Sequence, residues 1–148
     1  MPRTGALLSL SREHHTSLVM ARDARRVADD DDATACSAAI ARIEAHWHGM
    51  MAAHFDQEER LIRIAADTLD PESMARIFAD HAELRTLAGG PCSLEPAARL
   101  RRFADLTIAH VRYEERAFFP LLQSHPCVAV ASATASSPIQ SNPTQKGN

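Results

Sequence analysis

The sequence has 148 residues and a mass of 16.2 kDa, the length of one domain that can bury a core of its own. A formal net charge of −3 and an isoelectric point near 6.2 give no electrostatic reason to expect binding to nucleic acid or to an anionic membrane surface. Aromatic residues make up only 5% and glycines number 5, so the composition favours helix, and we expect no strands.

The cysteines and the amino terminus indicate the compartment. Cys36, Cys92 and Cys127 are odd in number, widely spaced and without a Cys-x-x-Cys pair, which argues against a disulfide framework or a zinc knuckle. The apolar run of residues 6–10 is interrupted by Ser9 and is too short for a signal peptide or a membrane span. We therefore expect reduced thiols in a cytoplasmic protein.

The first helix is predicted over residues 5–28, before a run of four aspartates. At ~100° per residue, one arc of this helix contains an apolar set: Leu7, Leu10, Leu18, Ala21 and Ala28. His14 falls at the centre of the arc and His15 at its margin. We expect His14 to point inward, with His15 as the alternative.

The second and longest helix is predicted from an N-cap at Asp32 or Thr34 to about residue 66. Its inward stripe reads Ile40, Ile43, Trp47, Met50, Met51, His54, Glu58, Leu61 and Ala65. His54 and Glu58 are four residues apart, so they lie within about 40° of each other on one face. His46 and His48 flank Trp47, and we expect both at the surface.

Asp70-Pro71 predicts the start of a third helix, with a carboxylate N-cap and proline at the first position. The helix extends to about residue 88, where Gly89-Gly90-Pro91 ends it. Its inward face holds Met74, Ile77, Phe78, His81, Leu84 and Ala88. His81 is central in this face, and Arg85 follows it by one turn.

A fourth helix is predicted from Ser93 or Glu95-Pro96 to about residue 123, with Pro120 expected to end or kink it. Its stripe reads Phe103, Leu106, His110, Glu114, Ala117 and Leu121, which repeats the His-to-Glu spacing of the second helix. Residues 124–148 are rich in Ser, Thr, Pro, Ala and Asn without periodicity, and we expect a disordered tail. Short connections favour an all-α, up-down-up-down antiparallel four-helix bundle over residues 1–123.

Each predicted helix thus has a histidine at the centre of its apolar arc, and two helices add a glutamate. Burying these groups uncompensated would cost several kcal/mol for each ionised group, against a total stability of about 5–15 kcal/mol. A cation should therefore lie among them. A structural zinc site takes four ligands, often thiolates, whereas six ligands from four helices fit two irons better, with Glu58 and Glu114 each bridging the pair.

Four segments in this order resemble the hemerythrin-like, HHE cation-binding family: Glu13-His14, His54-Phe55-x-x-Glu58-Glu59, Asp80-His81-x-x-Leu84, and His110-x-x-x-Glu114-Glu115 followed by Phe119-Pro120. The resemblance covers residues 7–123. It implies a four-helix bundle holding a non-haem di-iron centre, bridged by two carboxylates and an oxo or hydroxo group. The implied ligands are His14, His54, Glu58, His81, His110 and Glu114. The implied partner is O2 or another small diatomic or peroxide ligand, NO included. Separately from the resemblance, we allow for a homodimer.

The chain departs from the oxygen-carrying hemerythrins at two positions. Those carriers have a second histidine on the third helix where this chain has Arg85, and an aspartate five residues after the last histidine where this chain has Glu114 at four. Four histidines, two bridging glutamates and an oxo or hydroxo bridge leave about two of roughly twelve coordination positions open, whereas a reversible carrier wants a single vacancy, so the extra one invites water, peroxide or nitric oxide. Carrying, sensing and turnover of a ligand stay open as alternatives. Arg85 would either reach toward bound anions or point along the surface.

Two alternatives remain open at this point. One is a structural or interaction four-helix bundle that binds another divalent metal, zinc or manganese, without turnover. The other concerns Glu59 and Glu115, one position beyond the proposed bridges: we expect surface ion pairs with Arg63 or Arg112, and the alternative is a hydrogen bond to a ligand histidine.

Overall fold

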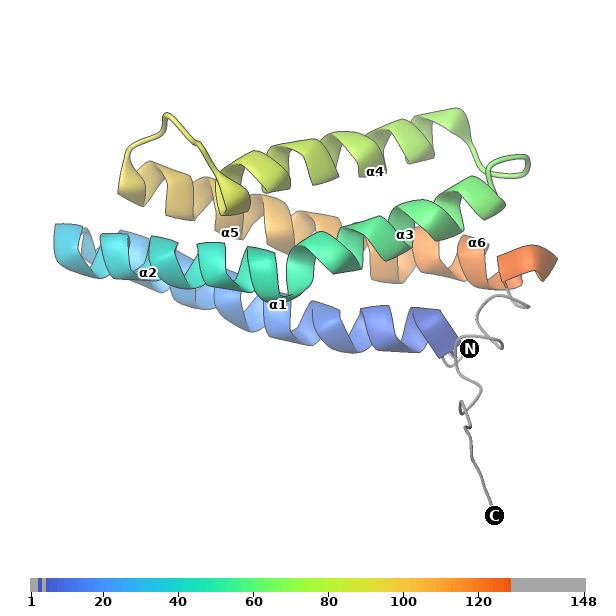
Figure 1. The fold of residues 1–148 in the computed structure, drawn as a ribbon, viewed down its shortest axis with the longest axis horizontal. Helices are drawn as coiled ribbons and strands as arrows, with labels where there is room; N and C mark the ends of the chain where they lie inside the picture. Colours follow the sequence, from blue (N-terminus) through green and yellow to red (C-terminus); the bar gives the residue numbers. More distant parts are fainter. Residues whose placement is uncertain (1–2, 4, 129–148) are drawn as a thin grey trace, which may run out of the picture.

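The computed structural model describes residue 3 and residues 5–128, and within these residues it contains helices and no strand. The elements form four uninterrupted helical runs that lie side by side along the long axis (Figure 1). These runs are α1 (Gly5–Asp30); α2 (Ala33–His46), η1 (Trp47–Met51) and α3 (Ala52–Ile64); α4 (Pro71–Leu84) and η2 (Arg85–Gly89); and α5 (Pro96–Tyr113), η3 (Glu114–Phe118) and α6 (Phe119–Ser124). The all-helical prediction is confirmed for the described residues.

The helix boundaries follow the capping signals of the sequence. Asp32 caps α2 by accepting a hydrogen bond of 3.1 Å from the Thr34 amide, so Asp32 and not Thr34 is the N-cap. Asp70 caps α4 in the same way through the Ser73 amide, also at 3.1 Å, with proline at the first helical position. Gly90 ends the third run with a positive φ of 67°, a conformation that favours glycine.

Three of the runs contain a π-helical turn: η1, η2 and η3. Such a turn holds one extra residue and therefore rotates the following part of the helix relative to the ideal 3.6-residue period. The effect is clear after Glu114, where Phe118 and Leu122 are buried while Leu121 is 51% exposed. The predicted stripe through Ala117 and Leu121 is therefore wrong. Pro120 does not end the fourth run, which continues to Ser124.

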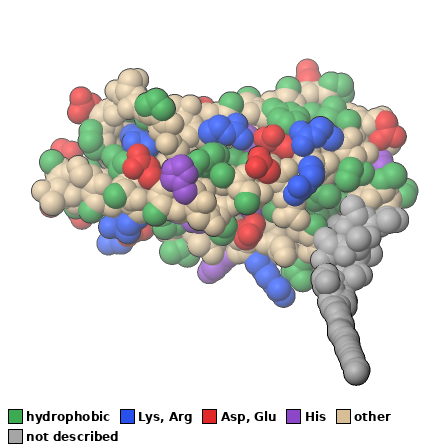
Figure 2. Space-filling model, in the orientation of Figure 1, with side chains coloured by type: hydrophobic (Ala, Val, Ile, Leu, Met, Phe, Trp, Pro, Cys, Tyr) green, Lys and Arg blue, Asp and Glu red, His purple; other side chains and the backbone are tan. Residues whose placement is uncertain are grey.

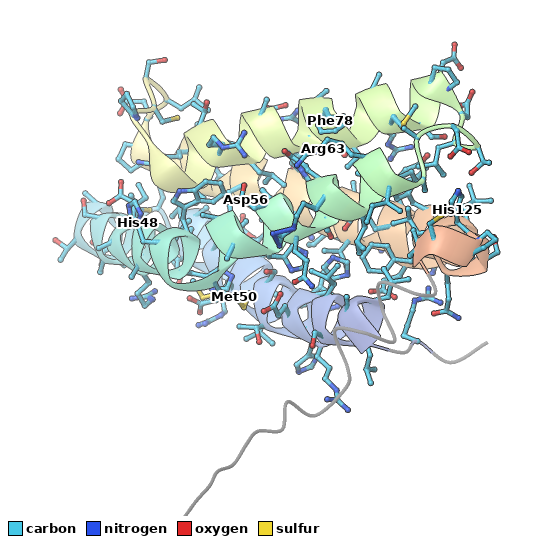
Figure 3. All side chains as sticks on the ribbon, turned by 45° about the vertical axis from the view of Figure 1, so that its right-hand side comes forward. His48, Met50, Asp56, Arg63, Phe78 and His125 are labelled. Atoms are coloured by element: carbon cyan, nitrogen blue, oxygen red, sulfur yellow. The ribbon has the colours of Figure 1, made fainter. Side chains whose placement is uncertain are left out.

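The inward prediction for Phe78 is also wrong, because its side chain is 37% exposed on α4 (Figure 3). The inward face of α4 is narrower than the predicted one and is formed by Ile77, His81 and Leu84. Phe78 follows Ile77 by about 100° and so lies on the flank of the helix.

Two apolar clusters form the core and lie on either side of a band of polar residues. One cluster contains Trp47, Met51, Phe55, Leu84 and Phe103, together with the alanines of the second half of α1. The other contains Leu7, Leu10, Leu61, Ile77, Phe118 and Leu122. On α1 the two sets are separated by His14, and on α3 by Glu58. The histidines and glutamates thus lie between two water-excluding layers.

The packed part of the chain extends beyond the predicted domain end at residue 123. Val128 is fully buried in the second cluster, and His125 is buried and lies 3.2 Å from Asp67 (Figure 3). The predicted disordered tail therefore begins too early, since Ser124 ends α6 and both His125 and Val128 are buried. The rest of that prediction, for residues 129–148, falls outside the described residues.

The surface fits the balanced composition. On the face shown in Figure 2, basic and acidic side chains are interspersed rather than segregated. Among the described residues, none of the helices has both the length and the apolar character that crossing a membrane requires. The three cysteines are free.

Candidate metal centre

The structure brings all six predicted site residues together in the polar band. His14 comes from α1, His54 and Glu58 from α3, His81 from α4, His110 from α5 and Glu114 from the start of η3. Each of these six residues is at most 5% exposed, and Glu58, His81 and Glu114 are fully buried. His15 is exposed, so His14 is the inward histidine of the first helix.

The two buried glutamates each lie between histidines. Glu58 Oε2 is 2.8 Å from His54 Nε2 and 3.4 Å from His14 Nε2, and its other oxygen, Oε1, is 2.8 Å from His81 Nε2. Glu114 Oε1 is 2.8 Å from His14 Nε2, and its Oε2 is 3.2 Å from His110 Nε2. Glu58 therefore directs one oxygen to His54 and His14 and the other to His81, whereas Glu114 directs one oxygen to His14 and the other to His110.

This arrangement forms two four-residue groups that share both glutamates. His14 and His54 with Glu58 and Glu114 form one group, and His81 and His110 with the same glutamates form the other. In each group the potential ligand atoms lie within 4.8 Å of one another. Two metal ions bridged by two carboxylates would need this pattern of donors.

Every one of the four histidines is held at its outer nitrogen by a carboxylate from a neighbouring run. The pairs are His14 Nδ1 with Glu115 at 2.6 Å, His54 Nδ1 with Glu13 at 2.8 Å, His81 Nδ1 with Glu59 at 2.8 Å, and His110 Nδ1 with Asp80 at 2.9 Å. An ionised carboxylate can only accept, so each Nδ1–H donates. The four Nε2 atoms are thereby left facing the centre, the arrangement found in metal-binding histidines.

These four carboxylates form a closed ring around the site. Glu13 of α1 holds the histidine of α3, and Glu59 of α3 holds the histidine of α4. Asp80 of α4 holds the histidine of α5, and Glu115 of η3 holds the histidine of α1. The expected surface ion pairs of Glu59 and Glu115 are therefore wrong, and the hydrogen-bonding alternative is correct. Sequence reasoning assigned no role to Glu13 and Asp80. Their only signal was an acidic residue directly before a central histidine.

Several inward atoms lack a hydrogen bond although they lie close together. His14 Nε2, His110 Nε2, Glu58 Oε2 and both oxygens of Glu114 are buried and have no hydrogen-bond partner. Among the Nε2 atoms, His81 makes a hydrogen bond, to Glu58 Oε1. Buried polar atoms are nearly always hydrogen-bonded, so these five unpartnered nitrogen and oxygen atoms call for another partner. A cation in each of the two groups would satisfy these atoms, and the residues thus fit metal ions.

The electrostatics of the cluster lead to the same requirement. Burial by itself would lower the pKa of His14, but the adjacent carboxylates of Glu114, Glu115 and Glu58 outweigh it and raise the pKa from 6.5 to about 11. The pKa of His54 rises to about 9 and that of His110 to about 10, again because neighbouring carboxylates outweigh burial. The carboxylates therefore demand positive charge, which protons supply when no metal is bound.

Aromatic rings fix the orientation of two of the imidazoles. Phe55 stacks on His81, with 3.9 Å between ring centroids and 8° between planes, and Phe119 stacks on His14 at 5.2 Å and 19°. Rings that are packed on one face and hydrogen-bonded at Nδ1 have little freedom to turn. The protein itself therefore fixes the orientation of these two imidazoles.

Arg85 and the flanking histidines lie outside the cluster. Arg85 is exposed, and its guanidinium lies over the Trp47 ring, 5.6 Å from the centroid, so it packs along the surface. His48 is exposed as expected. His46 is half-buried instead, with its Nε2 3.2 Å from Ser17 Oγ, and burial together with nearby His54 lowers its pKa.

Comparisons of the chain with protein-family models, with curated proteins and with solved structures return no match. The family resemblance therefore stays a prediction from the sequence motifs.

Proposed function

We propose that the protein is a non-haem di-iron protein of the hemerythrin-like kind, with its helical runs in an up-down-up-down antiparallel bundle, that binds or reacts with O2 or a related small oxidant or NO. The observation that carries the proposal is the pair of buried carboxylates, each with one oxygen toward the group of His14 and His54 and the other toward the group of His81 and His110. One ion would lie in each group, and Glu58 and Glu114 would bridge the two.

The donor set supports a redox-active first-row transition metal such as iron over a closed structural zinc site. Imidazole and carboxylate are ligands for first-row transition metals, and no cysteine belongs to either four-residue group in the described part of the chain. A closed tetrahedral zinc site needs four ligands, whereas the two groups offer six residues, two of them shared. Redox-active iron, when bound, would supply electrons to a small oxidant.

The protein's own residues would prepare the site for such a ligand. Of roughly twelve positions on two six-coordinate ions, four histidines would fill four, two bridging carboxylates four more and an oxo or hydroxo bridge two, so about two would stay open. Arg85 does not reach the cluster. The two apolar core clusters exclude bulk water from the site, and the carboxylate ring keeps each Nε2 directed at the metal.

Metal analysis and spectroscopy of the purified protein test this proposal. We expect about two irons per chain, with near-ultraviolet bands that disappear on anaerobic reduction and return in air. Protein that loads only zinc or manganese and stays colourless in both states would favour the alternative, a structural or interaction bundle without turnover. Well-folded protein that binds no metal would refute both readings.

A further inference from the structure

A small cavity lies directly beside the histidines. His14, His54 and His110 contribute to its lining, and its volume is about 10 Å³, close to the smallest space that holds one water molecule. Most of the remaining wall is apolar. Two hydroxyl groups interrupt this wall, those of Ser17 and Thr107.

Thr107 is 2% exposed, and its Oγ1 has no hydrogen-bond partner. A threonine inside a helix commonly bonds the carbonyl three or four residues earlier, but this hydroxyl does not. Thr107 precedes His110 by three residues on α5, so both side chains lie on the same face of the helix. An unpartnered hydroxyl in the wall of a cavity requires a partner inside that cavity.

Ser17 provides the second hydroxyl, from α1. It is 7% exposed and follows His14 by three residues, and its Oγ lies 3.2 Å from Nε2 of the half-buried His46. A serine hydroxyl can donate one hydrogen bond and accept others at the same time. With one bond made to His46, Ser17 keeps capacity for a group in the cavity.

We infer that Thr107, assisted by Ser17, is a ligand-positioning residue that holds one oxygen atom of a small ligand able to donate and accept hydrogen bonds, such as water or one end of hydrogen peroxide, beside the metal centre. A hydroxyl can both donate and accept, so a ligand that does both can satisfy its full hydrogen-bonding capacity. That this ligand reacts at the metal centre rests on the proposed function. That Thr107 forms a hydrogen bond to an oxygen atom in the cavity rests on the cavity alone.

The test compares the full-length protein with two variants. Thr107→Val keeps the shape of the side chain and removes the hydroxyl, whereas Thr107→Ser keeps the hydroxyl. Thr86→Val is the matched control, because Thr86 is exposed on η2 and its hydroxyl bonds the Ala82 carbonyl. High-resolution crystal structures of the purified proteins give a readout that does not depend on activity. We expect an ordered oxygen atom within hydrogen-bond distance of Thr107 in the wild type and in Thr107→Ser, and its loss in Thr107→Val.

The second readout is the concentration of hydrogen peroxide that half-saturates the spectral change of the iron-loaded protein. Losing one hydrogen bond should raise this concentration about 3- to 10-fold in Thr107→Val and leave it unchanged in the control. An unchanged cavity oxygen and an unchanged peroxide response in Thr107→Val would overturn the inference. So would a melting temperature well below that of the control, since it would assign the hydroxyl a structural role. If the protein takes up no iron, the proposed function fails while the crystal structures still decide the role of Thr107.

Discussion

The carboxylate ring makes a quantitative prediction for Asp80→Asn. Asp80 Oδ2 accepts the hydrogen bond of His110 Nδ1 at 2.9 Å, with the aspartate side chain only 16% exposed and the histidine side chain 2% exposed. Asparagine keeps an oxygen that can accept this bond but removes the charge. Hydrogen bonds to charged groups contribute about 1.5–3 kcal/mol and neutral ones about 0.5–1.5 kcal/mol. The difference of about 1–1.5 kcal/mol corresponds to roughly tenfold weaker metal binding, and Asp80→Ala, which removes the whole bond, should cost about 10- to 100-fold.

Anaerobic titration with ferrous iron against a competing chelator measures this change as a dissociation constant. Asp56→Asn is the matched control, because Asp56 is exposed on α3 and lies outside both metal-binding groups (Figure 3). Asp80→Asn should also keep its fold, which circular dichroism checks. If Asp80→Asn bound iron as tightly as Asp56→Asn, the ring would have no part in holding the metal ligands, and the reasoning would be refuted.

Three further predictions test the site and its packing. His81→Ala should lower iron content to one ion per chain or less, measured by elemental analysis, and undiminished iron would contradict the ligand assignment. Gly89→Ala should destabilise the protein by about 1–3 kcal/mol in urea unfolding, because its Cβ would lie 2.7 Å from Trp47 Nε1, whereas Gly49→Ala meets no atom within 4 Å and should not. The metal-free protein should lose stability at alkaline pH. The pKa values of three inward histidines are raised from 6.5 to about 9, 10 and 11, so their stabilising contribution is complete below pH ~6.5 and is lost as pH rises through that range. Thermal melts of chelator-treated protein should show this fall, and iron-loaded protein, whose imidazoles bind metal in place of protons, should not.

The sequence predicted the parts of the fold that depend on neighbours along the chain. Helix starts and ends depend on residues that act locally on the backbone. The helix starts at Asp32 and Asp70-Pro71 and the helix end at Gly90 could therefore be predicted. The four central histidines were also predictable, because each lies in the middle of an apolar arc. His14 could be preferred to His15 on the same basis, and its burial confirms that choice.

Other features of the fold cannot be read from a regular helical period of 3.6 residues. The extra residue in the η3 turn moved the buried positions from Ala117 and Leu121 to Phe118 and Leu122. The partners Glu13 and Asp80 could not be assigned, because each holds a histidine on a different run and not the one beside it in sequence. Such pairings depend on how the helices are rotated against each other.

The central claim is that two metal ions lie between two histidine pairs and share Glu58 and Glu114. Anomalous diffraction at the iron absorption edge, from crystals of the iron-loaded protein, tests it most directly. The account predicts two peaks, one beside His14 and His54 and the other beside His81 and His110, with both glutamates between them. A single peak, or iron bound elsewhere on the protein, would contradict it.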